Sequence, residues 1–212
     1  MKTFFFLSAC ALMLVFSACG PAFTFQEPQP TDAKNLDAIP RRMQGVYLNQ
    51  SDSSLLFVSD RLMFQRFEGA EWGHLSDLDM NHRLSGDSVT LLPTGRTIFA
   101  ERKGDSLYRP VEYNDTLFSL SFDNVLRKYQ GRFFMNTRLG PESWEVRMME
   151  LSRGTLSIHS VDAEEDWKSL KKITESSEDT LPVAVPANAR QFKEFVRSNG
   201  FRDIEKYSRI SR

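Results

Sequence analysis

The sequence predicts a mainly β protein: an antiparallel meander that forms a barrel or two packed sheets, followed by two short C-terminal helices. Three observations support this class. Short apolar or alternating runs between Gly45 and Ser160 are separated by turn residues about every ten residues, as in a meander and unlike βαβ units. The chain has 17 Phe, five Tyr and three Trp, and aromatic side chains fit pleated, half-buried surfaces. A similar stretch of sequence that leads into a predicted strand occurs twice, and the two copies start 86 residues apart.

Residues 1–18 have the layout of a secretory signal peptide. Lys2 supplies a positive charge, and the apolar run from Phe4 to Phe16 is shorter than the roughly 20 residues that a membrane-spanning helix needs. The run ends in FSAC (Phe16 to Cys19), which resembles the lipobox of bacterial lipoproteins, with Phe16 where Leu is usual. The resemblance implies cleavage before Cys19 and attachment of lipid to this cysteine. An ordinary secretory signal without lipid is the alternative.

Residues 19–35 are predicted to be a flexible tether, because they hold three prolines and few core-forming residues. Gly20 follows the cysteine, without the Asp that keeps many lipoproteins at the inner membrane. The resemblance therefore implies a lipid-anchored protein of the cell envelope, at the outer membrane. Cys19 is the only cysteine outside the signal, so the stability of the mature chain must come from its core and not from disulfides.

The charge of the mature chain is close to balanced. After removal of Lys2, 26 of the 27 basic side chains face 28 acidic ones. Nucleic-acid-binding domains usually carry a clear basic excess, so no nucleic-acid partner is expected.

The β-rich domain is predicted to cover residues 36–161. Its strands follow turn pairs that tolerate tight-turn conformations, and three of these pairs precede a new apolar alternation. These pairs are Gly86-Asp87, Gly104-Asp105 and Asn114-Asp115.

The repeat aligns Asp37–Asn49 (DAIPRRMQGVYLN) with Asp123–Met135 (DNVLRKYQGRFFM). In each copy an Asp is predicted to begin a short helical turn that contains a pair of basic residues. A Gly then ends this turn, and an aromatic residue begins the strand that follows. Internal duplication, with halves at 36–121 and 122–161, and convergent use of one strand-start device are both open interpretations. Either one makes the repeat part of the scaffold.

Residues 162–212 are predicted to form a helical segment that packs on the sheet. Asp162 opens a capping box before the first helix, and Asn188 caps the second. Gly200 has the place of a left-handed stop after the second helix. The residues DIEKYSRI that follow Arg202 are expected to be extended and to return as an edge strand.

The residues that could hold a metal ion lie in one polar segment, EGAEWGHLSDLDMNH, and they are His74, Asp77, Asp79 and His82. The spacing of the two histidines matches no zinc pattern, and the Asp-x-Asp-x-Asn run lacks the Gly and the Glu of a complete calcium loop. A polar hairpin or loop between two strands is the simpler interpretation, so no metal is expected. The third histidine, His159, is predicted to point to solvent from a strand.

No motif for catalysis appears in the sequence. A Gly-x-Ser-x-Gly elbow, a thiol nucleophile in the mature domain and a phosphate-cradling Gly-rich loop are all missing. We therefore expect no catalytic residue and no cofactor, and a binding or structural role. A hydrolase with a pair of carboxylates that meet only in the fold is the remaining enzymatic alternative. The expected partners are the membrane, through the lipid, and an envelope protein.

The alternative function is a carrier of a small apolar envelope ligand. Gly45 and Tyr47 in QGVYLN occupy the places of the Gly-x-Trp start of lipocalins, which this stretch resembles. An eight-stranded or larger barrel could enclose such a ligand.

Overall fold

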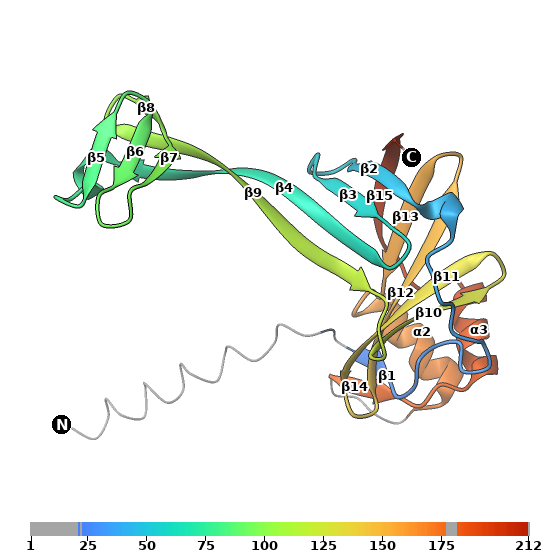
Figure 1. The fold of residues 1–212 in the computed structure, drawn as a ribbon. Helices are drawn as coiled ribbons and strands as arrows, with labels where there is room; N and C mark the ends of the chain where they lie inside the picture. Colours follow the sequence, from blue (N-terminus) through green and yellow to red (C-terminus); the bar gives the residue numbers. More distant parts are fainter. Residues whose placement is uncertain (1–20, 22, 177–181, 212) are drawn as a thin grey trace, which may run out of the picture.

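The computed structural model describes residues 21, 23–176 and 182–211 (Figure 1). It confirms the mainly β class with two short helices, α2 (Glu165–Thr174) and α3 (Ala189–Arg197). The described strands form a large mixed sheet and a separate three-stranded sheet, and they do not close into a barrel.

Two antiparallel meanders contribute eight of the twelve described strands of the large sheet. The first is β2 (Gly45–Asn49), β3 (Leu55–Val58), β4 (Leu62–His74) and β9 (Ser106–Ser119); the second is β10 (Asn124–Tyr129), β11 (Arg132–Gly140), β12 (Ser143–Ser152) and β13 (Thr155–Ser160).

The last strand, β15 (Asp203–Ser211), joins the two meanders. It pairs antiparallel with β13 on one side and with β2 on the other. The expectation of an edge strand is therefore wrong. Tyr207 explains the difference, because its fully buried ring belongs to the core between the meanders and its O–H donates to Glu205.

The two copies of the repeat differ in conformation and lie in contact. The first copy has the expected short helix, the 3₁₀ helix η2 (Arg41–Met43), before β2. The predicted helical turn is wrong in the second copy, because those residues form β10 and pair with β11. Leu36, just before the first copy, bridges to Leu126 inside the second, and Ile39 packs in the same core as Leu126.

Strands β11 and β12 bury both of their faces. On one face, Phe134, Val146 and Met148 pack against the two helices. They share a core with Phe192 of α3 and Leu170 of α2. The opposite face sends Phe133, Met135 and Met149 into a second core that also contains Tyr47 and Tyr207. The space inside the curved sheet is thus filled by side chains.

The N-terminal residues from Phe23 onward belong to the fold. Strand β1 (Phe23–Phe25) pairs parallel with β14 (Val183–Val185), and Phe25 lies opposite Trp144 of β12. Gln29 is fully buried and donates from Nε2 to the carbonyl of Ala187 at 2.9 Å. The prediction of a flexible tether over residues 19–35 is therefore wrong from Phe23 onward, since prolines there accompany buried, hydrogen-bonded chain. Cys19 and the signal peptide lie outside the described residues.

The cap at Asn188 is found as predicted, whereas the capping box predicted at Asp162 is wrong, because α2 begins at Glu165 with Glu164 at its N-cap position. Asn188 accepts hydrogen bonds from the N–H groups of Arg190 and Gln191, both at 3.0 Å. Asp162 accepts from the N–H of Glu165 at 2.7 Å, but its own N–H donates to Asp166 and not to Glu165.

Gly200 is required by close packing and not by a left-handed backbone. The positive φ angles at this helix end belong to Asn199 (59°) and Phe201 (65°). A Cβ atom on Gly200 would lie 2.5 Å from the ring of Phe195, so only glycine fits.

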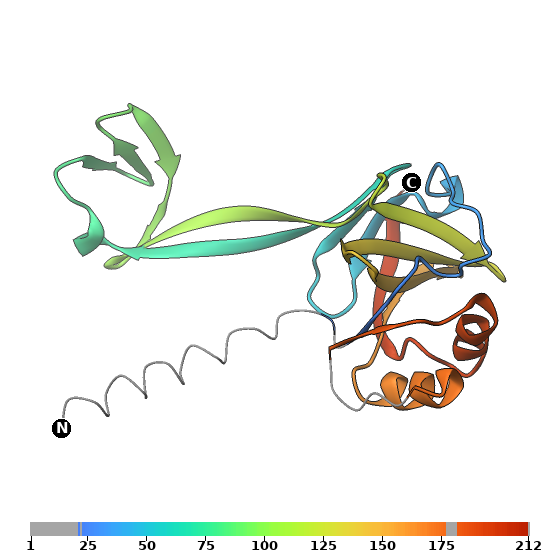
Figure 2. The ribbon, with the colours of Figure 1, turned by 90° about the horizontal axis from the view of Figure 1, so that it is seen from below.

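A two-stranded arm leaves the body of the protein (Figures 1 and 2). We define the arm as Phe67–His74 of β4 paired with Ser106–Tyr113 of β9. Its end carries the tip, residues 75–105, which holds the 3₁₀ helix η3 (Leu75–Asp77) and the strands β5 (His82–Ser85), β6 (Ser88–Leu91), β7 (Arg96–Phe99) and β8 (Glu101–Lys103). The predicted turn at Asn114-Asp115 is wrong, because both residues lie inside β9 opposite Arg66 and Gln65.

Candidate functional site

The arm exposes both of its faces. Apart from Leu107, which belongs to the core of the tip, no side chain that the structure describes in the arm is buried. Eight antiparallel residue pairs at about 3.4 Å per residue carry the tip about 27 Å away from the body. The arm is therefore a spacer with accessible side chains and not a wall of the core.

Cross-strand pairs hold the arm together. Arg109 donates from Nε to Glu71 at 3.0 Å, and the hydroxyl of Tyr113 reaches the same carboxylate at 3.4 Å. Glu68 and Glu112 lie directly opposite each other, a like-charge pair that is unfavourable in a sheet. Arg66 Nε, 3.7 Å from Glu112, compensates for one of these charges.

The root of the arm is stiffened by aromatic packing. The rings of Phe57 and Phe64 stack with centroids 4.7 Å apart, and the guanidinium of Arg66 lies 4.8 Å from the centroid of Phe57. The register between β4 and β9 shifts beside Phe64, and such irregularities bend a strand and increase its twist. The direction in which the arm leaves the body is therefore set by specific contacts.

The tip has its own small core and an apolar surface. Val89, Ala100 and Leu107 are buried together. Met80 and Phe99, by contrast, are 89% and 55% exposed, and Leu92 is exposed as well. Large apolar side chains on a small projecting unit are typical of a contact surface.

The four metal-ligand candidates lie at the junction between arm and tip, where each described contact is structural. Asp77 accepts from the N–H of His74 at 2.8 Å, as the cap of η3. Asp79 lies 2.7 Å from Nδ1 of His82 and accepts from the N–H of Asn81. These two contacts, that of Asn81 first, lower the pKa of the Asp79 carboxyl.

Within the described part of the chain, no group of three or more His, Cys, Asp or Glu side chains is placed to hold a metal ion. The expected polar loop is also only partly right, because Glu68–His74 continue β4 in full strand geometry.

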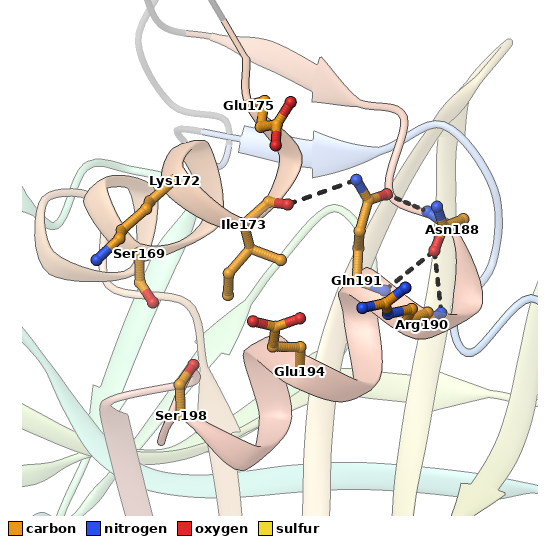
Figure 3. A pocket seen from close by; sticks show the side chains of 9 residues that line it. All are labelled: Ser169, Lys172, Ile173, Glu175, Asn188, Arg190, Gln191, Glu194 and Ser198. Carbon is orange, nitrogen blue, oxygen red and sulfur yellow. Dashed lines mark hydrogen bonds between the residues drawn. The ribbon is translucent and has the colours of Figure 1, made fainter.

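A groove of about 590 Å³ runs between α2 and α3 (Figure 3). Gln191 crosses it, with Oε1 accepting from the N–H of Asn188 at 3.0 Å and Nε2 donating to the carbonyl of Ile173 at 3.5 Å. Its polar groups therefore cap and join the helices. The lining residues are Ser169, Lys172, Ile173, Glu175, Asn188, Arg190, Gln191, Glu194 and Ser198, a mixture without a histidine or a nucleophile–base pair.

His159 is buried, so the prediction that it points to solvent is wrong. Only 8% of the residue is exposed, because the chain after α3 covers this face of β13. Its Nδ1 lies 3.3 Å from the carbonyl oxygen of Phe201, and its Nε2 lies 3.5 Å from Glu150. Arg132 also contacts Glu150, at 3.2 Å. The Nε2 atom is buried without a hydrogen-bond partner among the described residues, so the imidazole connects β13 to the loop before β15 through Nδ1.

Fold and site together define a mainly β protein with a projecting two-stranded arm. A scan against protein-family models finds no match, and searches of the curated proteins and of the solved structures find none either. Among the helices that the structure describes, none is long and apolar enough to cross a membrane.

Sequence reasoning missed the arm and the exposed residues of its tip. A strand is predicted after Gly104-Asp105, and Ser106–Tyr113 form one, but alternation cannot tell a strand of the body from a strand that buries neither face. In β4 the arm residues 68–73 are Glu, Gly and Ala except for Trp72, and these residue types are depleted in strands, so local propensity does not predict this half of the arm.

Proposed function

We propose that this chain is a lipid-anchored protein of the cell envelope that binds a protein partner through the arm and its tip. The FSAC motif at Cys19 supports the anchor, at the outer membrane. The arm is the observation that supports the binding role. A non-enzymatic function fits a surface that offers apolar contacts and no converging catalytic groups.

The arm is not explained by the stability of the body. Ordering a residue costs about 1–2 kcal/mol of conformational entropy, and an isolated two-stranded ribbon is marginally stable. Burial offsets this cost in the body, but the side chains of the arm stay accessible. A structure kept at such a cost is best explained by what it contacts.

The composition of the tip favours a protein over a charged surface. Residues 75–105 hold four basic and five acidic side chains, so the tip offers no basic patch to an anionic lipid surface. Its exposed Met80, Leu92 and Phe99 match the side chains that dominate protein–protein contacts.

The short distance from the proposed anchor to the body and the length of the arm are compatible with binding of a partner away from the membrane. Strand β1 begins at Phe23, four residues after Cys19, and four residues span at most about 14 Å. The body would therefore lie close to the membrane, while the arm reaches about 27 Å from the body. Such an arrangement lets a membrane-held protein contact a partner beyond its own surface.

A carrier function has less support from the same structure. The interior that a lipocalin-like carrier would use for its ligand is occupied by Tyr47, Phe133, Met149 and Tyr207. The groove shown in Figure 3 is lined mainly by polar and charged side chains.

Removal of the arm gives a direct test. Arg66 and Asn114 are cross-strand partners, so residues 67–113 can be replaced by an Asn-Gly turn that closes the hairpin. We expect the body to keep its cooperative unfolding, because both large cores lie outside the deleted residues.

The binding readout is site-specific photo-cross-linking in cells. A photoreactive residue at Phe99 should give one discrete protein adduct. The matched control is Phe122, which is 87% exposed on the body. An adduct at Phe122 without one at Phe99 would reject the proposal. So would a body that lacks the arm and still forms, from position 122, the same adducts as the intact protein.

A further inference from the structure

A second hollow, on the body and separate from the arm, is lined by four arginines. It has a volume of about 570 Å³ and lies where η2, the β12–β13 turn and β15 meet. Its lining consists of Arg41, Arg42, Leu151, Arg153, Gly154 and Arg209. The arginines come from three parts of the chain that are distant in sequence, and no acidic residue lines the hollow.

The four guanidinium groups have no carboxylate partner among the described residues. Arg42 instead donates to the carbonyl of Gly131 at 3.3 Å and lies 5.4 Å from the ring centroid of Phe133. The neighbouring hollow contains Glu150, but this acid already contacts Arg132. Cations gathered without counter-charges repel each other, and a bound anion would remove that repulsion.

Arg209 is held in place by three contacts. Its Nη2 donates to the carbonyl of Arg42 and to the hydroxyl of Tyr47, and its guanidinium lies 5.0 Å from the ring centroid of Tyr47. Its Nε is buried without a hydrogen-bond partner. A guanidinium fixed in this way loses little side-chain entropy when a ligand binds.

Arg153 occupies a backbone position that disfavours arginine. Its φ is 50°, and Gly154 follows with a φ of 82°, in a two-residue hairpin turn. Asn, Asp and Gly are the preferred residues at the first position of such a turn. Gln130 and Gly131 adopt nearly the same φ angles in the β10–β11 turn, so what distinguishes Arg153 is its position: its side chain lines the hollow.

We propose that this hollow binds a phosphate group, carried either by a small soluble molecule or by a lipid headgroup. Arginine forks match phosphate oxygens in a bidentate geometry, and several arginines together suit a group with more than one negative charge. Leu151 adds an apolar contact for the part of the ligand next to the phosphate. The proposal does not depend on the arm or on its partner.

The test measures ligand binding by the full-length protein in a non-ionic detergent, using isothermal titration calorimetry. The probes are glycerol 3-phosphate, short-chain phosphatidic acid, and the matching diacylglycerol that lacks the phosphate. Equal affinity for the first two identifies a soluble ligand. At least tenfold tighter binding of phosphatidic acid, with none of the diacylglycerol, identifies a lipid headgroup.

Two variants and one control connect the binding to the hollow. Arg153→Asn removes one charge while it supplies a favoured turn residue, so weaker binding cannot be attributed to misfolding. We expect this variant and Arg41→Gln each to lose about tenfold in affinity, since a charge-assisted hydrogen bond is removed. Arg96→Gln, on the tip, should bind as the wild type does. If no phosphate probe binds, or both hollow variants bind like the control, the proposal is wrong.

Discussion

The carboxylate of Asp166, which is fully buried, accepts a hydrogen bond of 2.8 Å from the guanidinium of Arg202. The same carboxylate accepts from the backbone N–H of Arg202 at 3.0 Å and from that of Asp162 at 2.8 Å. One side chain thus connects the start of α2 to the segment that leads into β15. The buried carboxylate satisfies three donors, one from the side chain and two from the backbone.

Asp166→Ala should therefore be strongly destabilising. The substitution removes the buried acceptor shared by three partly buried hydrogen bonds, and we expect a loss of about 1–3 kcal/mol in the free energy of unfolding. Urea unfolding followed by tryptophan fluorescence measures this loss. The control is Glu165→Ala in the same helical turn, because Glu165 is exposed and should matter little. Similar losses in both variants would show that Asp166 has no special role.

Gly200→Ala should destabilise the packing of α3 on the sheet. The added Cβ would meet the buried ring of Phe195 at 2.5 Å, and overpacking of this kind costs about 1–3 kcal/mol. Gly140→Ala is a suitable control, because a Cβ added there would meet no atom within 4 Å beyond its chain neighbours. The melting temperatures of the two variants should differ clearly, and equal values would contradict the close approach.

Asp162 gives stability a dependence on acid pH. The N–H of Glu165, and then that of Glu164, lower the pKa of this carboxyl below 3.8, its ordinary value. Because the pKa is lower in the folded state, the ionised carboxylate stabilises the folded protein at pH values above 3.8. This stabilisation is lost as the pH falls through the folded-state pKa. Asp162→Asn keeps a capping side chain without the titration.

The difference in melting temperature between wild type and Asp162→Asn should accordingly shrink between about pH 7 and about pH 3. Thermal unfolding followed by circular dichroism measures it. A difference that stays constant over this range would mean that the charged form of Asp162 is not preferred in the folded protein.

Cys19→Ala should abolish lipid attachment. Labelled palmitate should enter the wild-type protein, and the variant should lose both the label and its association with the membrane fraction. Cys10→Ala is the matched control, because Cys10 lies inside the signal and should leave labelling unchanged. Labelling that depends on Cys10, or that survives Cys19→Ala, would overturn the proposed anchor.

Local signals in the sequence predict the structure correctly where the interacting residues are close together in the chain. The cap at Asn188 and the turns at Gly86 and Gly104 involve neighbours within a few residues, and each is found as expected. The mainly β class follows from the same kind of signal, repeated along the chain.

The errors concern partners that are distant in the chain. The strand at Phe23 pairs with Val183, and His159 is covered by Phe201. Neither contact leaves a periodic pattern near the residue itself, so burial could not be deduced there.

The candidate sites show the same limit. Arg41 and Arg42 form a recognisable basic pair in the repeat, but only the fold brings them to Arg153 and Arg209. For the arm, the sequence predicts a strand after Gly104-Asp105, but no pattern in it indicates that this strand and its partner leave the body with both faces exposed.

The position of β15 also determines when the protein can finish folding. Strand β15 follows every other described strand in the sequence, but it lies between β13 and β2 in the sheet. Until it pairs, both meanders have an unpaired edge, and their shared core lacks Tyr207. The two meanders therefore become one sheet only when this single strand docks between them, and its loss would expose two strand edges at once.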